Sequence, residues 1–299
     1  MRVLVTGGNG FMGAWIIRRL LARGCHVRVF DQTEDRRLVD AVAGHGAAHG
    51  VTHGVSWHTG DIARNADVAA AMDGCGGVIH LAGVLTPFCA ADPVRGAEIN
   101  LIGTLNVFDA AIAHGLDRVI YTSSAGVFGP DDPVNPAPAS HYGAFKLACE
   151  GSARAYWTGR GMPSVGFRPF IVYGPGRETG VSAGPTLACR AAAQGESYTI
   201  PFTGTVGMVY VEDVAAAYES ALFGPCTGAR VVNLAGEPAS MDTIVALIRD
   251  QIPDAALSCA GPPLPITPGV VSDPMDAPAT PLAEGLARTI AFYRQVAAH

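Results

Sequence analysis

A tyrosine and a lysine four residues apart, Tyr142 and Lys146, form the pair in this sequence best suited to chemistry. The chain holds 20 lysine and arginine residues together, and all except Lys146 are arginine. On a helix, residues four apart lie on the same face, where the ammonium group would favour the phenolate. A free phenol has a pKa of about 10, and a fixed cation beside it allows proton exchange nearer neutral pH. The pair therefore predicts a general acid or base.

Two serine hydroxyls precede this pair. The run 118–124 is typical of a strand, and Ser123 and Ser124 stand at its carboxyl end. Serines at strand ends often only form turns. Together with the motifs described next, however, Ser124 is better interpreted as the group that holds a substrate oxygen beside the phenol.

The elements that must position these residues begin with strand 2–6, a glycine turn and the helical pattern 14–23. Such a turn lets a pyrophosphate approach the backbone at a helix N-terminus. The second strand, 26–31, ends in Asp31, which suits a ribose hydroxyl and would repel a 2′-phosphate. Gln32 follows it, although Arg36 and Arg37 lie further along, so the pattern favours NAD over NADP. The turn residues expected to bind the cofactor are Gly7, Asn9, Gly10, Phe11, Met12 and Gly13.

Further strands are predicted at 56–62, 77–83 and 164–169, with a helix at 93–114. Carboxyl ends of parallel strands face the ligand in a doubly wound sheet. Cofactor contacts are therefore expected at Asp61, Ile62, Leu81, Ala82, Gly83 and Pro169, with Asn100 on the long helix. His80 lies within an apolar run and is interpreted as a core histidine. These patterns predict an α/β fold, a doubly wound parallel (Rossmann) sheet.

Composition excludes several classes of protein. Hydrophobic residues make up 49% of the chain, and the net charge is −6 without any run of lysine and arginine. These values argue for a large core and against nucleic-acid or anionic-membrane partners. No apolar run reaches the roughly 18 residues of a membrane span, so a cytoplasmic enzyme acting on a small molecule is expected.

No metal site is predicted. The seven cysteines are scattered without a Cys-x-x-Cys spacing. His45, His49 and His53 would share a helix face as possible metal ligands, but the intervening glycines favour a loop.

Eight motifs in this order resemble the extended short-chain dehydrogenases/reductases, of the NAD-dependent epimerase/dehydratase kind. The motifs are the turn 6–13, Asp31, 61–62, 80–83, 123–124, Tyr142 with Lys146, 168–176 and 209–214. The resemblance implies that Tyr142 exchanges the hydroxyl proton, Lys146 bonds the nicotinamide ribose and lowers the tyrosine pKa, and Ser124 orients the carbonyl. It also implies a homodimer, with Asn100 supporting the lysine through its helix.

A Rossmann domain is expected at 1–173, with 206–235 returning to it. A smaller C-terminal substrate-binding lobe is expected at 174–205 and 236–299. Thr86, Ser123, Ile171 and Arg177 are the candidate substrate residues. Ile171 and Val206 stand where nucleotide-sugar relatives carry asparagine and arginine, which favours a substrate without a nucleotide.

Three functions are compatible with these motifs. The first is NAD-linked hydride transfer at a secondary alcohol or ketone of a small polyhydroxy substrate, such as a sugar, a sugar acid or a related alcohol. The second is a nucleotide-sugar 4-epimerase that retains its NAD. The third, a non-catalytic NAD-binding regulator, is disfavoured because Ser124, Tyr142 and Lys146 are all present.

Overall fold

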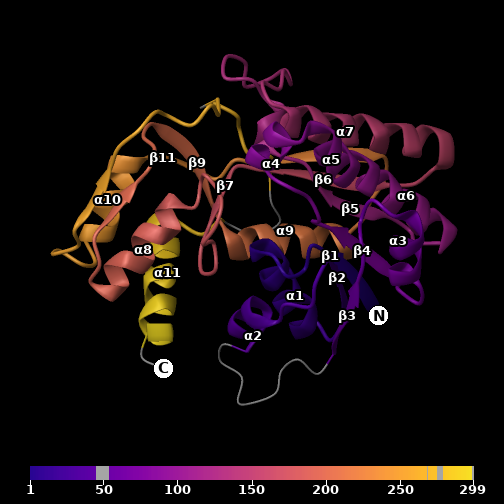
Figure 1. Ribbon diagram of the computed structural model, residues 1–299, viewed down its shortest axis with the longest axis horizontal. Helices are drawn as coiled ribbons and strands as arrows, with labels where there is room; N and C mark the ends of the chain where they lie inside the picture. The colour runs from indigo at the N-terminus through magenta and orange to yellow at the C-terminus, as the bar shows by residue number, and fades with distance from the viewer. Residues whose placement is uncertain (45–53, 268, 275–278, 298–299) are drawn as a thin grey trace.

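The computed structural model describes residues 1–299 except 45–53, 268, 275–278 and 298–299 (Figure 1). His45, His49 and His53 lie outside the described residues. The first elements are β1 (Arg2–Thr6), α1 (Phe11–Ala22), β2 (His26–Asp31), α2 (Arg37–Ala43), β3 (Val55–Thr59), α3 (Asn65–Met72), β4 (Gly77–His80), α4 (Thr86–Ala91), α5 (Pro93–Ala97), the π-helical η1 (Glu98–Ile102), α6 (Gly103–Ala113), β5 (Val119–Thr122), the 3₁₀ turn η2 (Ala125–Val127), α7 (His141–Arg160) and β6 (Ser164–Pro169). They are followed by β7 (Ile171–Tyr173), α8 (Gly184–Gln194), β8 (Tyr198–Ile200), β9 (Thr205–Tyr210), α9 (Val211–Phe223), β10 (Ala229–Leu234), β11 (Glu237–Ser240), α10 (Met241–Arg249), β12 (Leu257–Cys259) and α11 (Leu282–Ala297).

Seven parallel strands form the large sheet, in the order β10-β6-β5-β4-β1-β2-β3. The strand order reverses between β1 and β4, the topological switch point at which ligands bind in such sheets. The predicted fold class, a doubly wound α/β sheet, is confirmed.

Helices cover both faces of this sheet because its strands are apolar on both sides. Val3 and Val5 of β1 pack into one cluster with residues of α1 and α9, whereas Leu4 packs into a second cluster with residues of α3 and α6. Figure 1 shows α1 and α9 on one side of the sheet and α6 and α7 on the other.

The helix predicted at 93–114 is formed by three consecutive elements, α5, η1 and α6. The π-helical turn η1 contains Asn100, whose carbonyl oxygen accepts hydrogen bonds from the hydroxyl of Thr104 at 2.7 Å and the thiol of Cys149 at 3.3 Å. The wider turn thus links the helix to α7, which carries Cys149.

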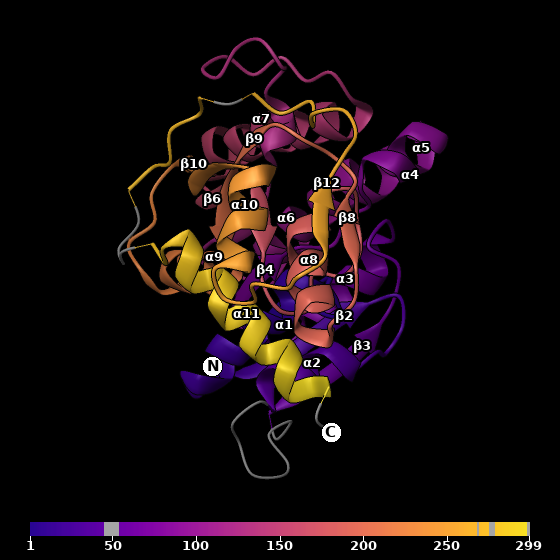
Figure 2. The ribbon, with the colours of Figure 1, turned by 90° about the vertical axis from the view of Figure 1, so that its left-hand side faces the viewer.

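A smaller group of elements lies beside the carboxyl ends of the large sheet (Figures 1 and 2). It contains a three-stranded sheet, β11-β9-β7, a two-stranded sheet, β12-β8, and the helices α8, α10 and α11. The chain then returns through α9, and β10 pairs with β6 at the edge of the large sheet. β9 pairs with β7 and β11 in the smaller sheet, so its strand pairing does not join it to the large one. The domain boundaries expected from the sequence stay a prediction.

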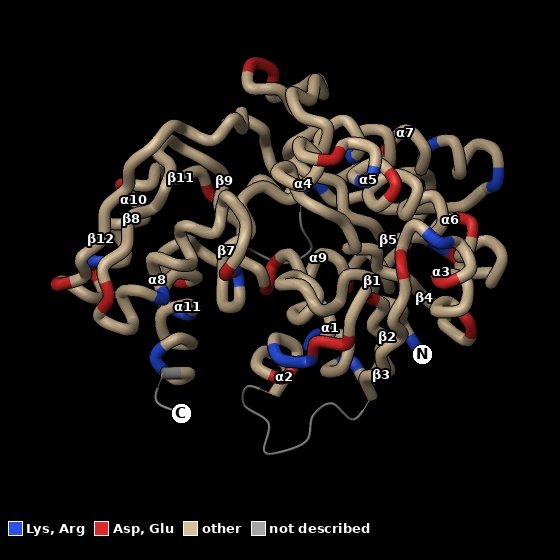
Figure 3. Tube along the Cα trace, in the orientation of Figure 1, with Lys and Arg blue, Asp and Glu red and all other residues tan. Residues whose placement is uncertain are grey.

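Acidic and basic residues are interspersed over the described chain (Figure 3). None of the helices in the described ranges is both long and apolar enough to cross a bilayer. Within those same ranges, no group of three or more histidine, cysteine, aspartate or glutamate side chains is arranged to hold a metal ion.

Candidate active site

The glycine turn between β1 and α1 packs directly against the end of β4. Gly7 has a φ of 69°, and a methyl group placed on it would lie 2.7 Å from the backbone nitrogen of Ala82. A methyl group on Gly13 would lie 2.7 Å from Cα of Gly8. Both distances are too short for a side chain, so glycine is required at both positions.

The first turn of α1 carries backbone N–H groups that no side chain caps. Gly10 at the N-cap has no side chain to accept them, and the first turn contains no acidic residue. Unpaired N–H groups and the helix dipole favour an anion at this end. The pyrophosphate of a dinucleotide therefore fits the turn.

Asp31 is the last residue of β2. Within the described part of the chain, its carboxylate accepts hydrogen bonds only from backbone N–H groups. Its Oδ2 accepts from the nitrogen of Asn9 at 3.2 Å and its Oδ1 from that of Gln32 at 2.9 Å. Burial raises the pKa of Asp31, and these two hydrogen bonds oppose that shift. A carboxylate with spare acceptor capacity beside the turn suits ribose hydroxyls.

The two arginines near Asp31 are occupied by acidic side chains. Arg36 pairs with Glu34 at 2.6 Å and lies over the ring of Trp57, and Arg37 pairs with Asp35 at 2.6 Å. Neither is left free for a 2′-phosphate, which agrees with NAD as the cofactor.

Asp61 and Ile62, after β3, are both held by protein groups. Asp61 accepts hydrogen bonds from the guanidinium of Arg95 at 2.6 Å and the nitrogen of Ala63 at 3.0 Å. Burial raises the pKa of Asp61, but these hydrogen bonds outweigh it and the net shift is downward. Ile62 is buried, and a methyl group on Gly103 of α6 would lie 2.9 Å from its side chain.

His80 at the end of β4 is a core residue, as expected from its apolar run. Its Nδ1 lies 2.7 Å from the hydroxyl of Thr6, and its Nε2 lies 3.1 Å from that of Thr104. Burial, with a smaller contribution from the charge of Lys146, lowers the pKa of His80 to about 3. The ring is therefore neutral near neutral pH.

Gly83 marks the place where β4, η1 and α7 converge. A methyl group on Gly83 would lie 2.6 Å from Oδ1 of Asn100 and 3.5 Å from Nζ of Lys146. The amide nitrogen of Asn100 donates to the carbonyl oxygens of Val84 and Gly96, at 3.0 and 3.1 Å. Its Oδ1 is buried and has no hydrogen-bond partner among the described residues. An acceptor is thus left free close to the ammonium group.

Helix α7 presents Tyr142 and Lys146 to the end of β5. Ser140 caps the helix by accepting from the nitrogen of Gly143 at 3.1 Å. The ammonium of Lys146 is buried, donates to the carbonyl oxygen of Thr122 at 2.8 Å and lies 5.8 Å from the centroid of the Tyr142 ring. One strand end therefore fixes the position of the cation relative to the phenol.

Ser124 follows the same strand and lies beside Tyr142. A methyl group on Gly126 would lie 3.3 Å from Oγ of Ser124 and 3.6 Å from a ring carbon of Tyr142. The hydroxyl of Ser124 accepts a hydrogen bond from the nitrogen of Gly126 at 3.0 Å. Because only its acceptor capacity is used in this contact, the hydroxyl can still donate to another oxygen.

A buried ion pair supports this arrangement, and sequence reasoning did not find it. Glu150 of α7 accepts from Nε and Nη2 of Arg168 at 2.7 and 2.6 Å and from the hydroxyl of Ser123 at 2.5 Å. All three residues are at least half-buried. The sequence did contain one signal for Glu150, because this residue follows Lys146 by one helical turn and so lies on the same face of the helix. Ser123, predicted to contact the substrate, instead uses its hydroxyl to hold α7 against β5.

The remaining predicted residues are scattered around this centre. The nitrogen of Leu81 donates to the Thr6 hydroxyl at 3.2 Å, and Pro169 ends β6. Thr86 is exposed on α4, whereas Ile171 of β7 is buried in the core. Arg177 follows β7, and its guanidinium lies 5.7 Å from the Phe11 ring centroid.

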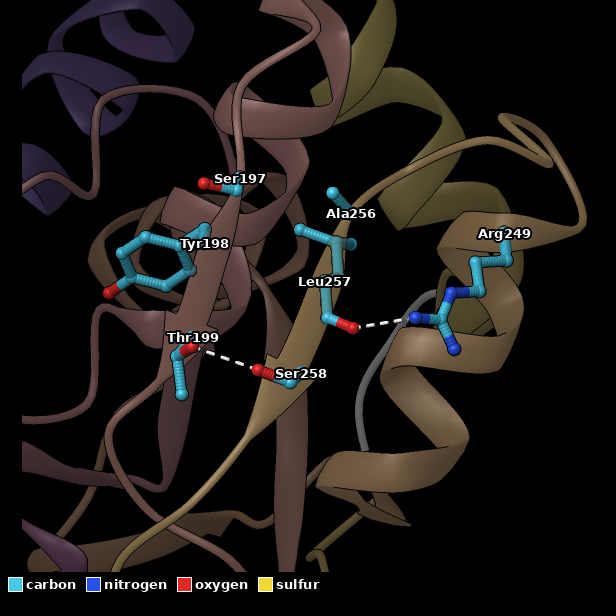
Figure 4. A pocket seen from close by; sticks show the side chains of 7 residues that line it. All are labelled: Ser197, Tyr198, Thr199, Arg249, Ala256, Leu257 and Ser258. Atoms are coloured by element: carbon cyan, nitrogen blue, oxygen red, sulfur yellow. Dashed lines mark hydrogen bonds between the residues drawn. The ribbon is translucent and has the colours of Figure 1, made fainter.

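A hollow in the smaller group of elements contains none of the predicted site residues (Figure 4). It is lined by Ser197, Tyr198, Thr199, Arg249, Ala256, Leu257 and Ser258. Arg249 donates to the carbonyl oxygen of Leu257 at 2.6 Å, and the hydroxyls of Thr199 and Ser258 lie 2.8 Å apart. These polar groups satisfy one another, and nothing in the hollow suggests hydride transfer.

Known proteins resemble the chain to different extents. It is 34% identical over 195 residues to the 3 beta-hydroxysteroid dehydrogenase type 7 of Mus musculus, a match to 58% of this chain and 51% of that protein. The chain therefore spans about half the length of that relative. It is 30% identical over 261 residues to the 2-alkyl-3-oxoalkanoate reductase of Stenotrophomonas maltophilia (strain K279a), covering 82% of this chain and 74% of the reductase.

The chain also matches a solved structure and a family model. The UDP-glucose 4-epimerase of Thermus thermophilus, crystallised with NAD, matches with a TM-score of 0.82 and 27% identity over 98% of this chain and 99% of the epimerase. Residues 3–235 match the NAD dependent epimerase/dehydratase family. The chain therefore belongs to this family of extended short-chain dehydrogenases/reductases, and it is an enzyme that uses NAD.

Proposed function

We propose that this enzyme transfers a hydride between NAD and a secondary alcohol or ketone of a small molecule, with Ser124, Tyr142 and Lys146 as its catalytic residues. The observation that carries the proposal is their convergence. Lys146 is held by the last residue of β5 and lies 5.8 Å from the ring of Tyr142, and Tyr142 and Ser124 flank Gly126. These residues come from a helix and a strand end, and each has the chemistry that its role needs.

In the oxidative direction, the phenolate of Tyr142 accepts the hydroxyl proton of the alcohol, and bound NAD would supply the acceptor for the hydride. The ammonium of Lys146 stabilises the phenolate, which is the form of Tyr142 that can accept this proton. Ser124 donates to the substrate oxygen and keeps it beside the phenol. In the reductive direction the same groups act in reverse, and Tyr142 returns the proton.

The substrate that we propose is a small polyhydroxy compound, such as a sugar, a sugar acid or a related alcohol. Ile171 and Val206, at the positions where nucleotide-sugar relatives are polar, are both buried within the core cluster. Neither can hydrogen-bond a diphosphate through its side chain. The mouse and Stenotrophomonas relatives carry names that mention no nucleotide sugar.

A nucleotide-sugar 4-epimerase is the second candidate. The chain resembles UDP-glucose 4-epimerase of Thermus thermophilus along almost its whole length. An epimerase of this kind would use the same three residues and retain its NAD.

Two measurements separate the candidates. The first follows NADH formation when the purified protein and added NAD are mixed with sugars, aldonates and polyols. The second follows melting temperature with UDP or UDP-glucose at millimolar concentration. NADH formation without stabilisation by UDP is the expected result. Clear stabilisation by UDP-glucose, with interconversion of the sugar and no net NADH, would favour the epimerase instead.

A further inference from the structure

One largely buried arginine has no anionic partner. The Nε of Arg177 is buried and has no hydrogen-bond partner among the described residues. One terminal nitrogen donates to the hydroxyl of Ser182 at 3.2 Å. No ion pair within the described part of the chain includes Arg177. The acid next to it, Glu178, pairs with Arg190 at 3.1 Å.

This state contrasts with that of Arg168, another largely buried arginine. Arg168 is fully engaged, because Glu150 accepts two of its hydrogen bonds. A guanidinium withdrawn from water without a carboxylate destabilises the folded chain. Groups of this kind persist at functional sites because a ligand supplies the missing partner.

The surroundings of Arg177 belong to the proposed active site. Its guanidinium lies 5.7 Å from the ring centroid of Phe11 in the glycine turn. A methyl group on Gly180 would lie 3.4 Å from both Nη2 of Arg177 and a methyl carbon of Leu85, a side chain that is 44% exposed. Burial lowers the pKa of Arg177, and the charge of an ionised Tyr142 partly offsets this effect. The guanidinium therefore lies beside Phe11, at the turn that suits a pyrophosphate.

We propose that Arg177 binds an oxyanion in the active site, a carboxylate of the substrate or a phosphate of NAD. This inference rests on the proposed function for its placement beside the reacting groups. The planar fork of a guanidinium matches the paired oxygens of either group. If the anion belongs to the substrate, the substrate is a hydroxy or oxo acid.

The first arm of the test measures stability without added ligand. Arg177→Met removes an unpaired buried charge, so its melting temperature should equal or exceed that of the parent. Arg190→Met is the matched control, because it removes an arginine of the same lobe that already has an acid partner. A large loss of stability or a failure to fold in Arg177→Met alone would mean a structural role and would overturn the proposal.

The second arm identifies the source of the anion. Calorimetry measures NAD affinity, and thermal shifts at saturating NAD compare D-gluconate with D-glucitol and 3-hydroxybutyrate with 1,3-butanediol. If the anion is a phosphate, Arg177→Met should weaken NAD binding by about 10- to 100-fold. If it is a carboxylate, NAD affinity should be kept. D-gluconate or 3-hydroxybutyrate, but not the corresponding neutral alcohol, should then raise the melting temperature of the parent. The same acid should not raise the melting temperature of Arg177→Met.

Unchanged NAD affinity together with no stabilisation of the parent by either acid would overturn the inference. Failure of the proposed function gives a different pattern. In that case an acid would bind through Arg177, but no NADH would form with any panel substrate. Arg177→Lys, which keeps the charge without the fork, should restore part of the lost affinity.

Discussion

At the scale of single residues, Tyr142 is the side chain whose oxygen the proposed reaction requires. Tyr142→Phe removes that oxygen and leaves the ring packed beside Gly126. Turnover should fall by about 100-fold or more, since positioned acid–base groups contribute about 10²–10⁴. NADH formation measures the loss, and calorimetry should give an NAD affinity close to that of the parent.

Lys146→Arg is a companion variant for the same mechanism. A larger fork cannot occupy the buried place of an ammonium that donates to Thr122. Turnover should again fall severely. Normal turnover in the Tyr142→Phe protein would rule out the mechanism, whatever the effect of the lysine variant.

Asp31 should set the choice of cofactor. Its carboxylate has spare acceptor capacity, and the nearby Arg36 and Arg37 are paired with acids. Asp31→Ala should weaken NAD binding by about tenfold, the equivalent of one charged hydrogen bond, and shift the relative preference toward NADP. Calorimetry with both cofactors checks this, and tighter binding of NADP by the parent would contradict it.

His80 should make the folded enzyme sensitive to acid. Its folded pKa of about 3 lies below the ordinary histidine value of 6.5, so the unfolded chain binds the proton more readily. Its contribution to stability is present above pH 6.5 and is lost as the pH falls toward 3. Within this window the loss amounts to about 1.4 kcal/mol per pH unit.

His80→Gln keeps groups that can bond to Thr6 and Thr104 but does not titrate. The difference in unfolding free energy between the parent and this variant should shift in favour of the variant below about pH 6. Denaturant unfolding from about pH 7 to about pH 4 measures it. If the unfolding free energies of the two proteins changed with pH in parallel, His80 would accept a proton as readily in the folded state as in the unfolded chain.

At the scale of elements, α7 depends on a buried anchor. Glu150 and Arg168 have side chains that are 5% and 13% exposed, and Ser123 joins them. Glu150→Gln would leave the guanidinium of Arg168 buried without a counter-charge, at a cost of about 3–5 kcal/mol. Chemical denaturation measures the loss.

The matched control is Glu98→Gln, which breaks the more exposed pair with Arg95. Exposed pairs contribute about 1 kcal/mol or less, so this variant should be nearly as stable as the parent. Equal losses in the two variants would show that the buried pair does not anchor α7.

At the scale of the whole molecule, we predict a homodimer that forms through η1 and α7. Ile102 of η1 is 42% exposed and Trp157 of α7 is 38% exposed, although both are large apolar side chains. Ile102→Glu should therefore yield a monomer by light scattering at micromolar concentration. Val134→Glu, in the loop before α7, replaces a more exposed valine and should not change the mass.

A monomeric parent protein would refute this arrangement. Val94 of α5 is 72% exposed and would offer a further site for the same test.

The sequence by itself determined the sheet and the cofactor, and it predicted Tyr142 and Lys146 as the acid–base pair. Their signals are local: a glycine turn after a strand, a carboxylate ending the next strand, and a tyrosine and lysine one helical turn apart. Local spacing of this kind follows from backbone geometry, so strands such as β6 were predicted at the bounds that the structure has.

Only the tertiary structure decided which side chains are buried in the core. Ser123 and Ile171 were both predicted near the substrate. The hydroxyl of Ser123 instead donates to Glu150, and the side chain of Ile171 is buried in the core. The unpaired state of Arg177 could not be predicted either, because a missing partner depends on every group that packs around it. Burial and pairing across distant segments arise from the whole fold, and no local pattern encodes them.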